Sequence, residues 1–388
     1  MKRIINYILV FVGVSVGLMA CTHHDEPTPP VPPEEVNRTV LVYMVANNNL
    51  GSNGYDKLDI REMQTAARAG DTGAGRLLVY HSPYNAKPHL LEIKATGIDT
   101  LLTYDNSVLS VSAARMAEVL ADTHKYAPAD EYGMVLWSHG TGWVHDGIDE
   151  PAYQRSFGEE RGKKMNTSTL ARVLEASNID FSFLYFDCCY MMSIETLYEL
   201  RNTAPFIVGS PTELPVLGMP YDKNVKQLFA PEQPELVAAA QNTFDFYNAL
   251  TGEDRTCTMS VVRTAAIAPL AEATRAIYEA CGAGIPAGYS PQRFSYVSQT
   301  RCYYFDYKDY MNALCDAASR PDLAIRFNEA FADATVFSAA TPKLWDAVPL
   351  DRCNGISTYI LTNASSSATG NYKDLDWYAD VASVVKFE

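Results

Sequence analysis

The sequence predicts an α/β fold built on a mostly parallel sheet with helices on both faces. The observation behind this is that apolar runs of strand length alternate with amphipathic stretches of helical length. The apolar runs are nearly continuous, which is typical of strands that are buried on both faces of a parallel sheet. With 388 residues, 47% of them hydrophobic, the chain is long enough to bury a large core.

The first half of the chain carries the clearest alternation. Strands are expected at residues 38–50, 76–82, 131–140, 179–189 and 205–210, with a hairpin at 84–104. Helices are expected at residues 55–70, 112–128, 166–178 and 192–202. We therefore place the main α/β domain at residues 38–225.

After residue 225 the pattern becomes more helical. Helices are expected at residues 234–250 and 264–284, and a late strand at 354–361. This region, 226–388, either completes the core of the main domain or flanks it, and the sequence does not decide between the two.

The N-terminus reads as an export signal. Lys2 and Arg3 precede an apolar stretch at residues 4–20, which ends in "LMAC". Small residues before a cysteine resemble the bacterial lipobox, and this resemblance implies cleavage before Cys21 and a lipid on its sulfur. The Pro-rich segment that follows, up to residue 37, is expected to be a tether. We predict a lipid-anchored protein of the cell envelope that faces the periplasm or the cell surface; an ordinary signal peptide and a short anchor helix are the alternatives.

The net charge and the cysteine pattern limit which partners and which disulfides can be expected. A formal net charge of −15 disfavours binding to nucleic acid or to anionic membrane surfaces. Membrane contact is therefore expected through the lipid anchor only. Of the eight cysteines, five lie in the last third at irregular spacing, so buried thiols and disulfides both stay open. The oligomeric state is open as well.

Two predicted strand ends carry reactive side chains. His139 follows the apolar run that ends at Trp137, and Cys188 and Cys189 follow Asp187. In open parallel sheets, functional residues gather at the carboxyl ends of strands. Only one helix separates the two strands, so we expect them to be neighbours.

A thiol and an imidazole at adjacent strand ends suit nucleophilic catalysis. A cysteine nucleophile needs a nearby base to hold it as a thiolate, and a helix beginning just after Cys189 would stabilise that charge further. The N–H groups of Gly140 and Cys189 are candidates for an oxyanion hole. The alternative is a structural histidine beside two core thiols, and the spacing of 50 residues does not decide, because any strand–helix–strand unit gives a similar gap.

Five segments in order resemble motifs of the clostripain family of cysteine peptidases. They are "TVLVYMVANNNL", "LWSHGTGW", "FDCCYMMSIETLYELR", "GSPTELP" and "NGISTYIL". The resemblance implies a caspase-like fold, shared with caspases, gingipains and separase, with residues 38–225 as its catalytic domain. It also implies a His–Cys dyad endopeptidase that cleaves proteins or peptides after basic residues, with Arg preferred to Lys.

The resemblance assigns roles residue by residue. His139 matches the catalytic histidine, Gly140 the oxyanion glycine and Cys189 the nucleophile, while Cys188 occupies a small-residue position. Asp187, two residues before the nucleophile, matches an acid of the S1 pocket, which receives the P1 side chain. Strand alternation agrees, since residues i and i+2 face the same side. A helix-capping role is the alternative for Asp187; Glu213 is a second S1 candidate, with an ordinary loop acid as its alternative.

The chain also departs from the family pattern. Where the family has Ala-Asp-Asn-Asp-Leu, this chain has three asparagines at residues 47–49. Losing two carboxylates puts the calcium dependence of some family members in doubt, so neither a metal nor another cofactor is predicted. The family matures by self-cleavage between its His and Cys. Candidate sites here are Arg155, Arg161, Lys163 and Lys164, with a solvated basic hairpin as the alternative.

Two other function classes stay open from the sequence. One is a hydrolase of another amide or acyl substrate, and the other is a non-catalytic surface binding protein on the same fold. The presence of His139, Gly140 and Cys189 disfavours the binding protein. Asp187 favours a cationic P1 group over a neutral ester.

Overall fold

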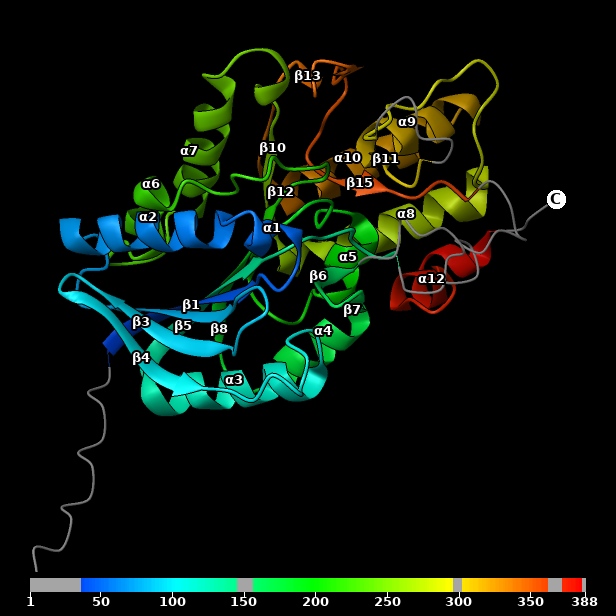
Figure 1. Ribbon diagram of the computed structural model, residues 1–388. Helices are drawn as coiled ribbons and strands as arrows, with labels where there is room; N and C mark the ends of the chain where they lie inside the picture. The colour runs from blue at the N-terminus through cyan, green and yellow to red at the C-terminus, as the bar shows by residue number, and fades with distance from the viewer. Residues whose placement is uncertain (1–35, 145–155, 296–301, 362–371, 386–388) are drawn as a thin grey trace, which may run out of the picture. The chain divides into compact units, whose positions relative to one another are not determined.

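A nine-stranded sheet forms the centre of the computed structural model, which describes residues 36–144, 156–295, 302–361 and 372–385 (Figure 1). The strands lie in the order β12-β10-β9-β8-β5-β1-β2-β3-β4. Their bounds are β1 Val36–Val45, β2 Arg76–Ser82, β3 His89–Lys94, β4 Gly97–Thr103, β5 Ala129–Trp137, β8 Phe181–Asp187, β9 Phe206–Gly209, β10 Thr258–Arg263 and β12 Thr335–Ala340. The five strands β9, β8, β5, β1 and β2 run parallel, and antiparallel strands complete both edges.

Strand β1 shows why the apolar runs form this sheet. Alternate side chains of the strand enter two separate clusters, with Leu41 and Tyr43 in one and Val40 and Val42 in the other. All four are almost completely buried. A strand with helices on both sides must be apolar at every position, so the run is continuous.

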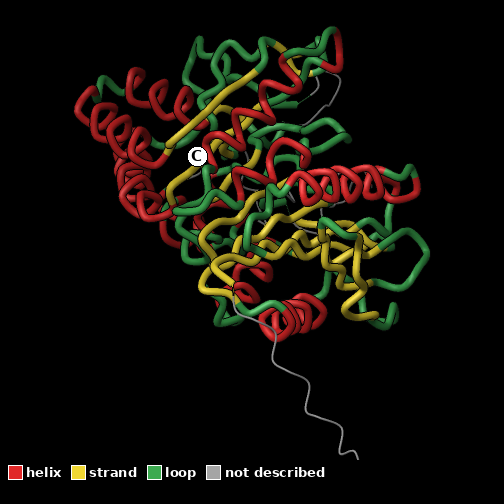
Figure 2. Tube along the Cα trace, turned by 90° about the vertical axis from the view of Figure 1, so that its left-hand side faces the viewer, coloured by secondary structure: helices red, strands yellow, loops and turns green. Residues whose placement is uncertain are grey.

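Helices cover both faces of the sheet, and Figure 2 shows the strands between them. One face is covered by α2 Tyr55–Ala69, α6 Tyr221–Leu228 and α7 Leu236–Asn248. The other is covered by α3 Ala113–Tyr126, α4 Thr167–Glu175, α5 Ile194–Glu199 and α8 Ile267–Cys281, with α9 Tyr307–Ala317, α10 Pro321–Ala334 and α12 Asp376–Asp380 beyond (Figure 1). The predicted α/β sheet flanked by helices is confirmed.

One short helix and three small strand pairs lie outside the main sheet. They are the helix α1 Asn49–Ser52 and the strand pairs β6 Phe157–Glu160 with β7 Lys163–Met165, β11 Phe305–Asp306 with β15 Ser357–Thr358, and β13 Lys343–Leu344 with β14 Val348–Pro349. Two of these pairs, β6–β7 and β13–β14, are antiparallel hairpins that matter for the site.

Several predicted bounds were wrong. The first strand ends at Val45, because residues 48–52 form a cap and a short helix. The helix expected from residue 192 begins at Ile194, because Tyr190 and Met192 donate backbone hydrogen bonds to Thr212 and Ser210. Of the late strand, only Ser357–Thr358 pairs, outside the main sheet.

The region after residue 225, where the sequence predicts a more helical pattern, also adds β10 and β12 to the main sheet. Each of these strands directly adjoins a helix in the chain, so its apolar residues are not set apart from the helical pattern. None of the seven cysteines among the described residues forms a disulfide. In the same part of the chain, no helix is both apolar enough and long enough to cross a membrane.

Candidate active site

The ends of β5 and β8 bring His139 and Cys189 together. The two strands are parallel neighbours, and Trp137 is the register partner of Asp187. His139 and Cys189 each follow two residues after this pair, so they leave the sheet side by side. Both line one pocket of about 220 Å³, which is also lined by Gly140, Asp187 and Glu213. The predicted site residues from three separate segments therefore share one cavity.

Asn49 is the hydrogen-bond partner of His139 that sequence reasoning missed. Its Oδ1 lies 2.6 Å from His139 Nε2. The residue is the first of helix α1, whose cap is the side chain of Asn48. An amide oxygen facing Nε2 favours the tautomer with the proton on Nε2, which leaves the Nδ1 lone pair to act as a base. The asparagine run is evident in the sequence, but no local pattern links it to a histidine 90 residues away.

The sulfur of Cys189 lies against the segment that follows β9. The backbone N–H of Leu214 points at Sγ at 3.3 Å, and Sγ lies 3.7 Å from the Leu214 carbonyl oxygen. A donor at this distance stabilises negative charge on sulfur. The next residue, Tyr190, has φ +61°, a conformation that bulky side chains rarely adopt. This turn ends the strand sharply and leaves Cys189 in the pocket wall.

Cys188 differs from its neighbour in burial and in contacts. Its thiol is buried and donates to the carbonyl oxygen of Leu136 at 2.9 Å. Burial is the largest cause that raises the pKa of this thiol well above its ordinary value. A thiol held neutral in this way is a poor nucleophile.

Residue 140 must be glycine because no side chain fits there. A Cβ at this position would lie 2.6 Å from the carbonyl oxygen of Cys189 and 2.7 Å from Cys188 Cβ. The chain there also bridges to Phe157, through hydrogen bonds that use the N–H groups of Thr141 and Gly158. The bridge does not use the Gly140 N–H.

Asp187 lies in the pocket as a buried carboxylate. It accepts hydrogen bonds from the Met219 N–H at 3.0 Å and from the Tyr221 hydroxyl at 3.1 Å. Burial raises its pKa to about 6, although both hydrogen bonds act in the opposite direction. A Cβ on Gly218, which has φ +65°, would come within 2.8 Å of a carboxylate oxygen. Only glycine therefore allows the backbone to pass this close to the acid, and both residues line the pocket.

A second buried acid, Asp59 of helix α2, lies behind the pocket and was missed by the sequence reasoning. Its Oδ2 accepts a hydrogen bond of 2.6 Å from the indole N–H of Trp137, which lines the pocket. Burial first, and the nearby Asp187 second, raise the pKa of Asp59 to about 9. An acid placed mid-helix carries no sequence signal for this role, since helices usually expose such residues.

Glu213 lies in the wall of the pocket, away from Asp187 along the 213–218 segment. Its Oε1 accepts a hydrogen bond of 3.1 Å from the Tyr190 hydroxyl, and its Oε2 accepts one of 2.7 Å from the indole N–H of Trp345. Trp345 lines the same pocket. Glu213 is thus part of the site, with both carboxylate oxygens engaged by aromatic donors.

The basic segment after His139 is described only in part, since Arg155 lies outside the described residues, as does Cys21. Arg161 is exposed and lies in the turn between β6 and β7, and Lys163 is also exposed. The side chain of Lys164 is only 7% exposed and pairs with Glu159 at 3.7 Å.

The three asparagines at residues 47–49, two of which stand where the family has carboxylates, all make hydrogen bonds within the protein. The amide group of Asn47 donates to Glu160 and accepts from the Asn85 N–H. Asn48 caps helix α1, and Asn49 contacts His139. Among the described residues, no group of three or more His, Cys, Asp or Glu side chains is arranged to hold a metal ion.

The chain matches the model of the clostripain family over residues 42–343. It is similar to the structure of an inactive zymogen C11 protease from Parabacteroides distasonis, with 29% identity, a TM-score of 0.77, and coverage of 90% of this chain and 99% of the other. It is also similar to a secreted C11 cysteine protease from Bacteroides thetaiotaomicron in complex with an irreversible peptide inhibitor, with 28% identity, a TM-score of 0.76, and coverage of 89% and 99%.

A third structure, iotapain from Bacteroides thetaiotaomicron, shares the fold with 22% identity and a TM-score of 0.77, over 90% of this chain and 100% of the other. A comparison with curated proteins found no match. These likenesses confirm the predicted fold class. They also favour a peptidase over the alternative of a non-catalytic binding protein. The chain is a cysteine-type peptidase and belongs to the clostripain family.

Proposed function

We propose that this protein is an endopeptidase that uses Cys189 as nucleophile and His139 as base, and that it cleaves after Arg in preference to Lys. The observation that carries the proposal is that Cys189, His139 and the buried Asp187 line one pocket. A nucleophile, a base and an acid for a cationic side chain are the parts that this reaction needs.

In the proposed mechanism, His139 Nδ1 takes the thiol proton and Sγ attacks the carbonyl carbon of the scissile bond. The carbonyl oxygen becomes an oxyanion, held by the N–H groups of Gly140 and Cys189. His139 then gives its proton to the leaving amine, and an acyl-enzyme remains. A water molecule, deprotonated by His139, attacks this thioester; the acid product leaves and the thiol is restored.

Asn49 is proposed to hold the tautomer of His139 that this mechanism needs. Replacing Asn49 with Ala removes the Nε2 partner at 2.6 Å. We expect kcat to fall by about tenfold or more while KM changes little, because the base is then free to rotate or to adopt the wrong tautomer.

The S1 pocket is proposed to bind the P1 side chain at Asp187. A guanidinium that leaves water needs a carboxylate to offset its lost hydration, and Arg can make two parallel contacts where Lys makes one. Asp187 and Gly218 both line the pocket, so such a group would approach the carboxylate from the pocket.

The test is a panel of fluorogenic peptides with Arg, Lys, Asp or a neutral residue at P1, with residues 22–388 as the enzyme. Arg substrates should be cleaved fastest. Cys189→Ala should abolish cleavage, and Cys188→Ala, the matched control, should keep most of it. An Arg-based electrophile that labels Cys188 instead of Cys189 would overturn the assignment of the nucleophile.

Self-cleavage between His139 and Cys189 is a further part of the proposal. Peptidases bind their substrates extended, and Arg161 and Lys163 are exposed near the tip of the β6–β7 hairpin, whereas Lys164 is mostly buried. Fragments of the wild type should end at Arg155, Arg161 or Lys163, and Cys189→Ala should stay intact. An active wild type that remains a single chain would show that cleavage is not required.

The lipid anchor on Cys21 remains a prediction. Metabolic labelling with palmitate should tag the wild type, and Cys21→Ser should release the protein from membranes. A wild type that is unlabelled and found only in the soluble fraction would contradict it.

A further inference from the structure

The hairpin β13–β14 brings an aromatic side chain to the pocket from the C-terminal region of the chain. Trp345 follows β13, and its indole lines the pocket together with Leu214 and Val216. The indole N–H donates to Glu213, which is 132 residues away in the sequence. No feature of the local sequence explains why a tryptophan should be held there.

Trp345 is held in a conformation that the chain rarely adopts. Its φ is +53° and that of Asp346 is +51°. Left-handed backbone at a bulky residue is costly and persists where the surroundings hold it in place, often at functional sites. Here the Trp345 N–H donates to Thr256 Oγ1 at 2.7 Å, the indole is bound by Glu213, and Lys343 pairs with Asp346 across the turn.

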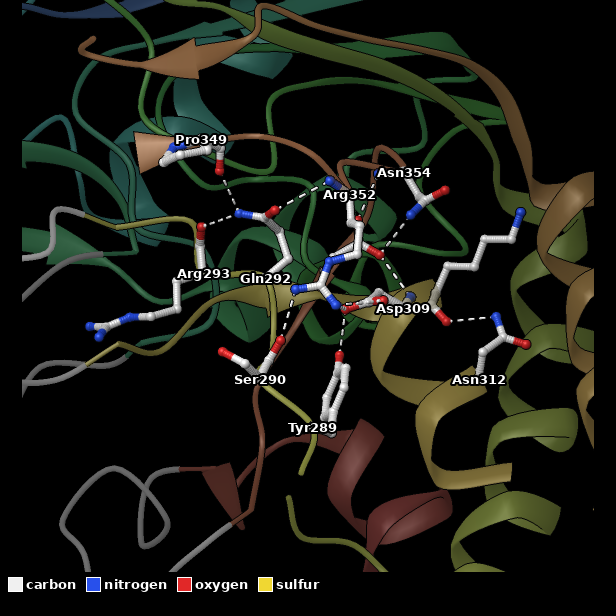
Figure 3. Close-up of polar contacts among 11 residues, drawn as sticks. Tyr289, Ser290, Gln292, Arg293, Asp309, Asn312, Pro349, Arg352 and Asn354 are labelled. Atoms are coloured by element: carbon white, nitrogen blue, oxygen red, sulfur yellow. Dashed lines mark hydrogen bonds and ion pairs between the residues drawn. The ribbon is translucent and has the colours of Figure 1, made fainter. Parts of the chain in front are cut away.

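A polar network fixes the base of the hairpin, as Figure 3 shows. The side-chain amide of Gln292 donates to the carbonyl oxygen of Pro349, the last residue of β14, and its Oε1 accepts from the Arg352 N–H. The Arg352 guanidinium reaches Asp309 of helix α9 and the carbonyl oxygen of Ser290 (Figure 3). The hairpin is therefore tied to the protein at both its tip and its base.

The sheet order decides which half of a substrate Trp345 faces. His139 follows β5, Cys189 follows β8, and the 213–216 segment follows β9, in that spatial order. The leaving amine takes its proton from His139, so the C-terminal half of the substrate lies on the β5 side. The N-terminal half, beginning with P1, lies on the β9 side, where Leu214, Val216 and Trp345 are found.

The rim on this side is apolar and partly open. Val216 is 48% exposed, which is unusual for a large aliphatic side chain that lines a pocket, and Leu214 is 8% exposed. We propose that Trp345, Leu214 and Val216 form the S2 subsite, which takes a large apolar side chain of the residue preceding P1. Glu213 is then a positioning residue that holds the indole. The inference rests on the proposed function, because it names a subsite of the same site.

The experiment compares two peptides that share Arg at P1 and differ only in Leu or Gly at P2. For the wild type, kcat/KM should favour Leu by about tenfold, since burying such a side chain is worth roughly this factor or more. Trp345→Ala should reduce this preference to within about twofold, mainly by slowing the Leu peptide. Ile325→Ala, which truncates a large apolar side chain that is 59% exposed on α10, is the control and should keep the full preference.

A binding measurement with inactive variants distinguishes failure of the proposed subsite from failure of the proposed function. The same peptides, uncleaved, are titrated into Cys189→Ala and into the Cys189→Ala, Trp345→Ala double variant. A wild type that cleaves neither peptide would count against the proposed function alone, and the binding preference for Leu would still report on S2. Equal losses for both peptides on removing Trp345, or an unchanged preference, would overturn the subsite.

Glu213→Gln tests the positioning role. Glutamine keeps an oxygen for the indole N–H, so the Leu preference should survive, whereas Glu213→Ala should weaken it as Trp345→Ala does. A full preference for Leu in Glu213→Ala, or its loss in Glu213→Gln, would contradict this role.

Discussion

The pocket is lined by two carboxylates, one from the end of β8 and one from the segment after β9, and their surroundings differ. Asp187, from the end of β8, is only 6% exposed, with the Gly218 backbone packed against its carboxylate and a second acid, Asp59, close enough for the two charges to interact. Glu213, after β9, is half-buried, and both of its oxygens hold aromatic side chains. Both oxygens of Asp187 also accept hydrogen bonds, from the Met219 N–H and the Tyr221 hydroxyl, so the two acids differ in burial and not in the number of donors. A carboxylate that is kept from water attracts a ligand cation more strongly than one that is half-exposed.

The largest expected effect is on kcat/KM for substrates with a positive charge at P1, and it distinguishes Asp187 from Glu213. Asp187→Asn should lower kcat/KM for an Arg substrate by about tenfold to a hundredfold or more, since a charge-assisted contact is worth about 1.5–3 kcal/mol. For the matched neutral citrulline substrate the loss should be small. Glu213→Gln should change the Arg/citrulline ratio by less than about threefold, because its charge is screened by partial exposure. The opposite ranking would move the S1 charge to Glu213.

The pH dependence sharpens the same contrast. Asp187 must be ionised to bind a guanidinium, and burial raises its pKa to about 6. The Arg/citrulline ratio of kcat/KM should therefore rise from pH 5 to pH 7 by about tenfold or less, with a midpoint near this value. Using the ratio cancels the titration of His139 and Cys189. A ratio that does not vary with pH in wild type would show that Asp187 does not bind the P1 cation.

Stability should change in the direction opposite to activity. The native state keeps the proton of Asp187 up to about pH 6, while the unfolded chain loses it near 3.8, so wild-type stability falls as pH rises between these values. Asp187→Asn removes this cost. Its free energy of unfolding should exceed that of the wild type by about 1–2 kcal/mol at pH 8, after partial offset by weakened hydrogen bonds, and match it near pH 4. Denaturant unfolding at both pH values measures this; a less stable variant at pH 8 would mean that the hydrogen bonds dominate.

The smallest effect is expected for Asp59. Burial and Asp187 raise its pKa to about 9, so it is neutral at pH 7. Asp59→Asn keeps an oxygen for the Trp137 indole, and kcat/KM for Arg substrates should change by less than about threefold. Asp59→Leu is the matched test of the hydrogen bond and should cost more, because the indole N–H would be buried without its partner. A large loss in Asp59→Asn would mean that Asp59 contributes charge to S1.

Much of the fold followed from the sequence, because the relevant signals are local. Continuous apolar runs predicted the buried strands, and their ends pointed to His139, Gly140, Asp187 and Cys189, which the structure brings into one pocket. The errors lie where local signals are weak. The short strands β10 and β12 were missed, and the helix after Cys189 was begun too early because pairing of Tyr190 and Met192 with the 210–212 segment overrides helical propensity.

The sequence by itself determined the family motifs, the α/β class and the strand ends that carry the proposed dyad, because each depends on residues close together in the chain. Only the tertiary structure decided which side chains surround them. Asn49 contacts His139 across 90 residues, Asp59 contacts Trp137 across 78, and Glu213 contacts Trp345 across 132. Each of these pairs joins segments from different elements, and hydrogen bonds of this kind depend on packing geometry that no local pattern encodes.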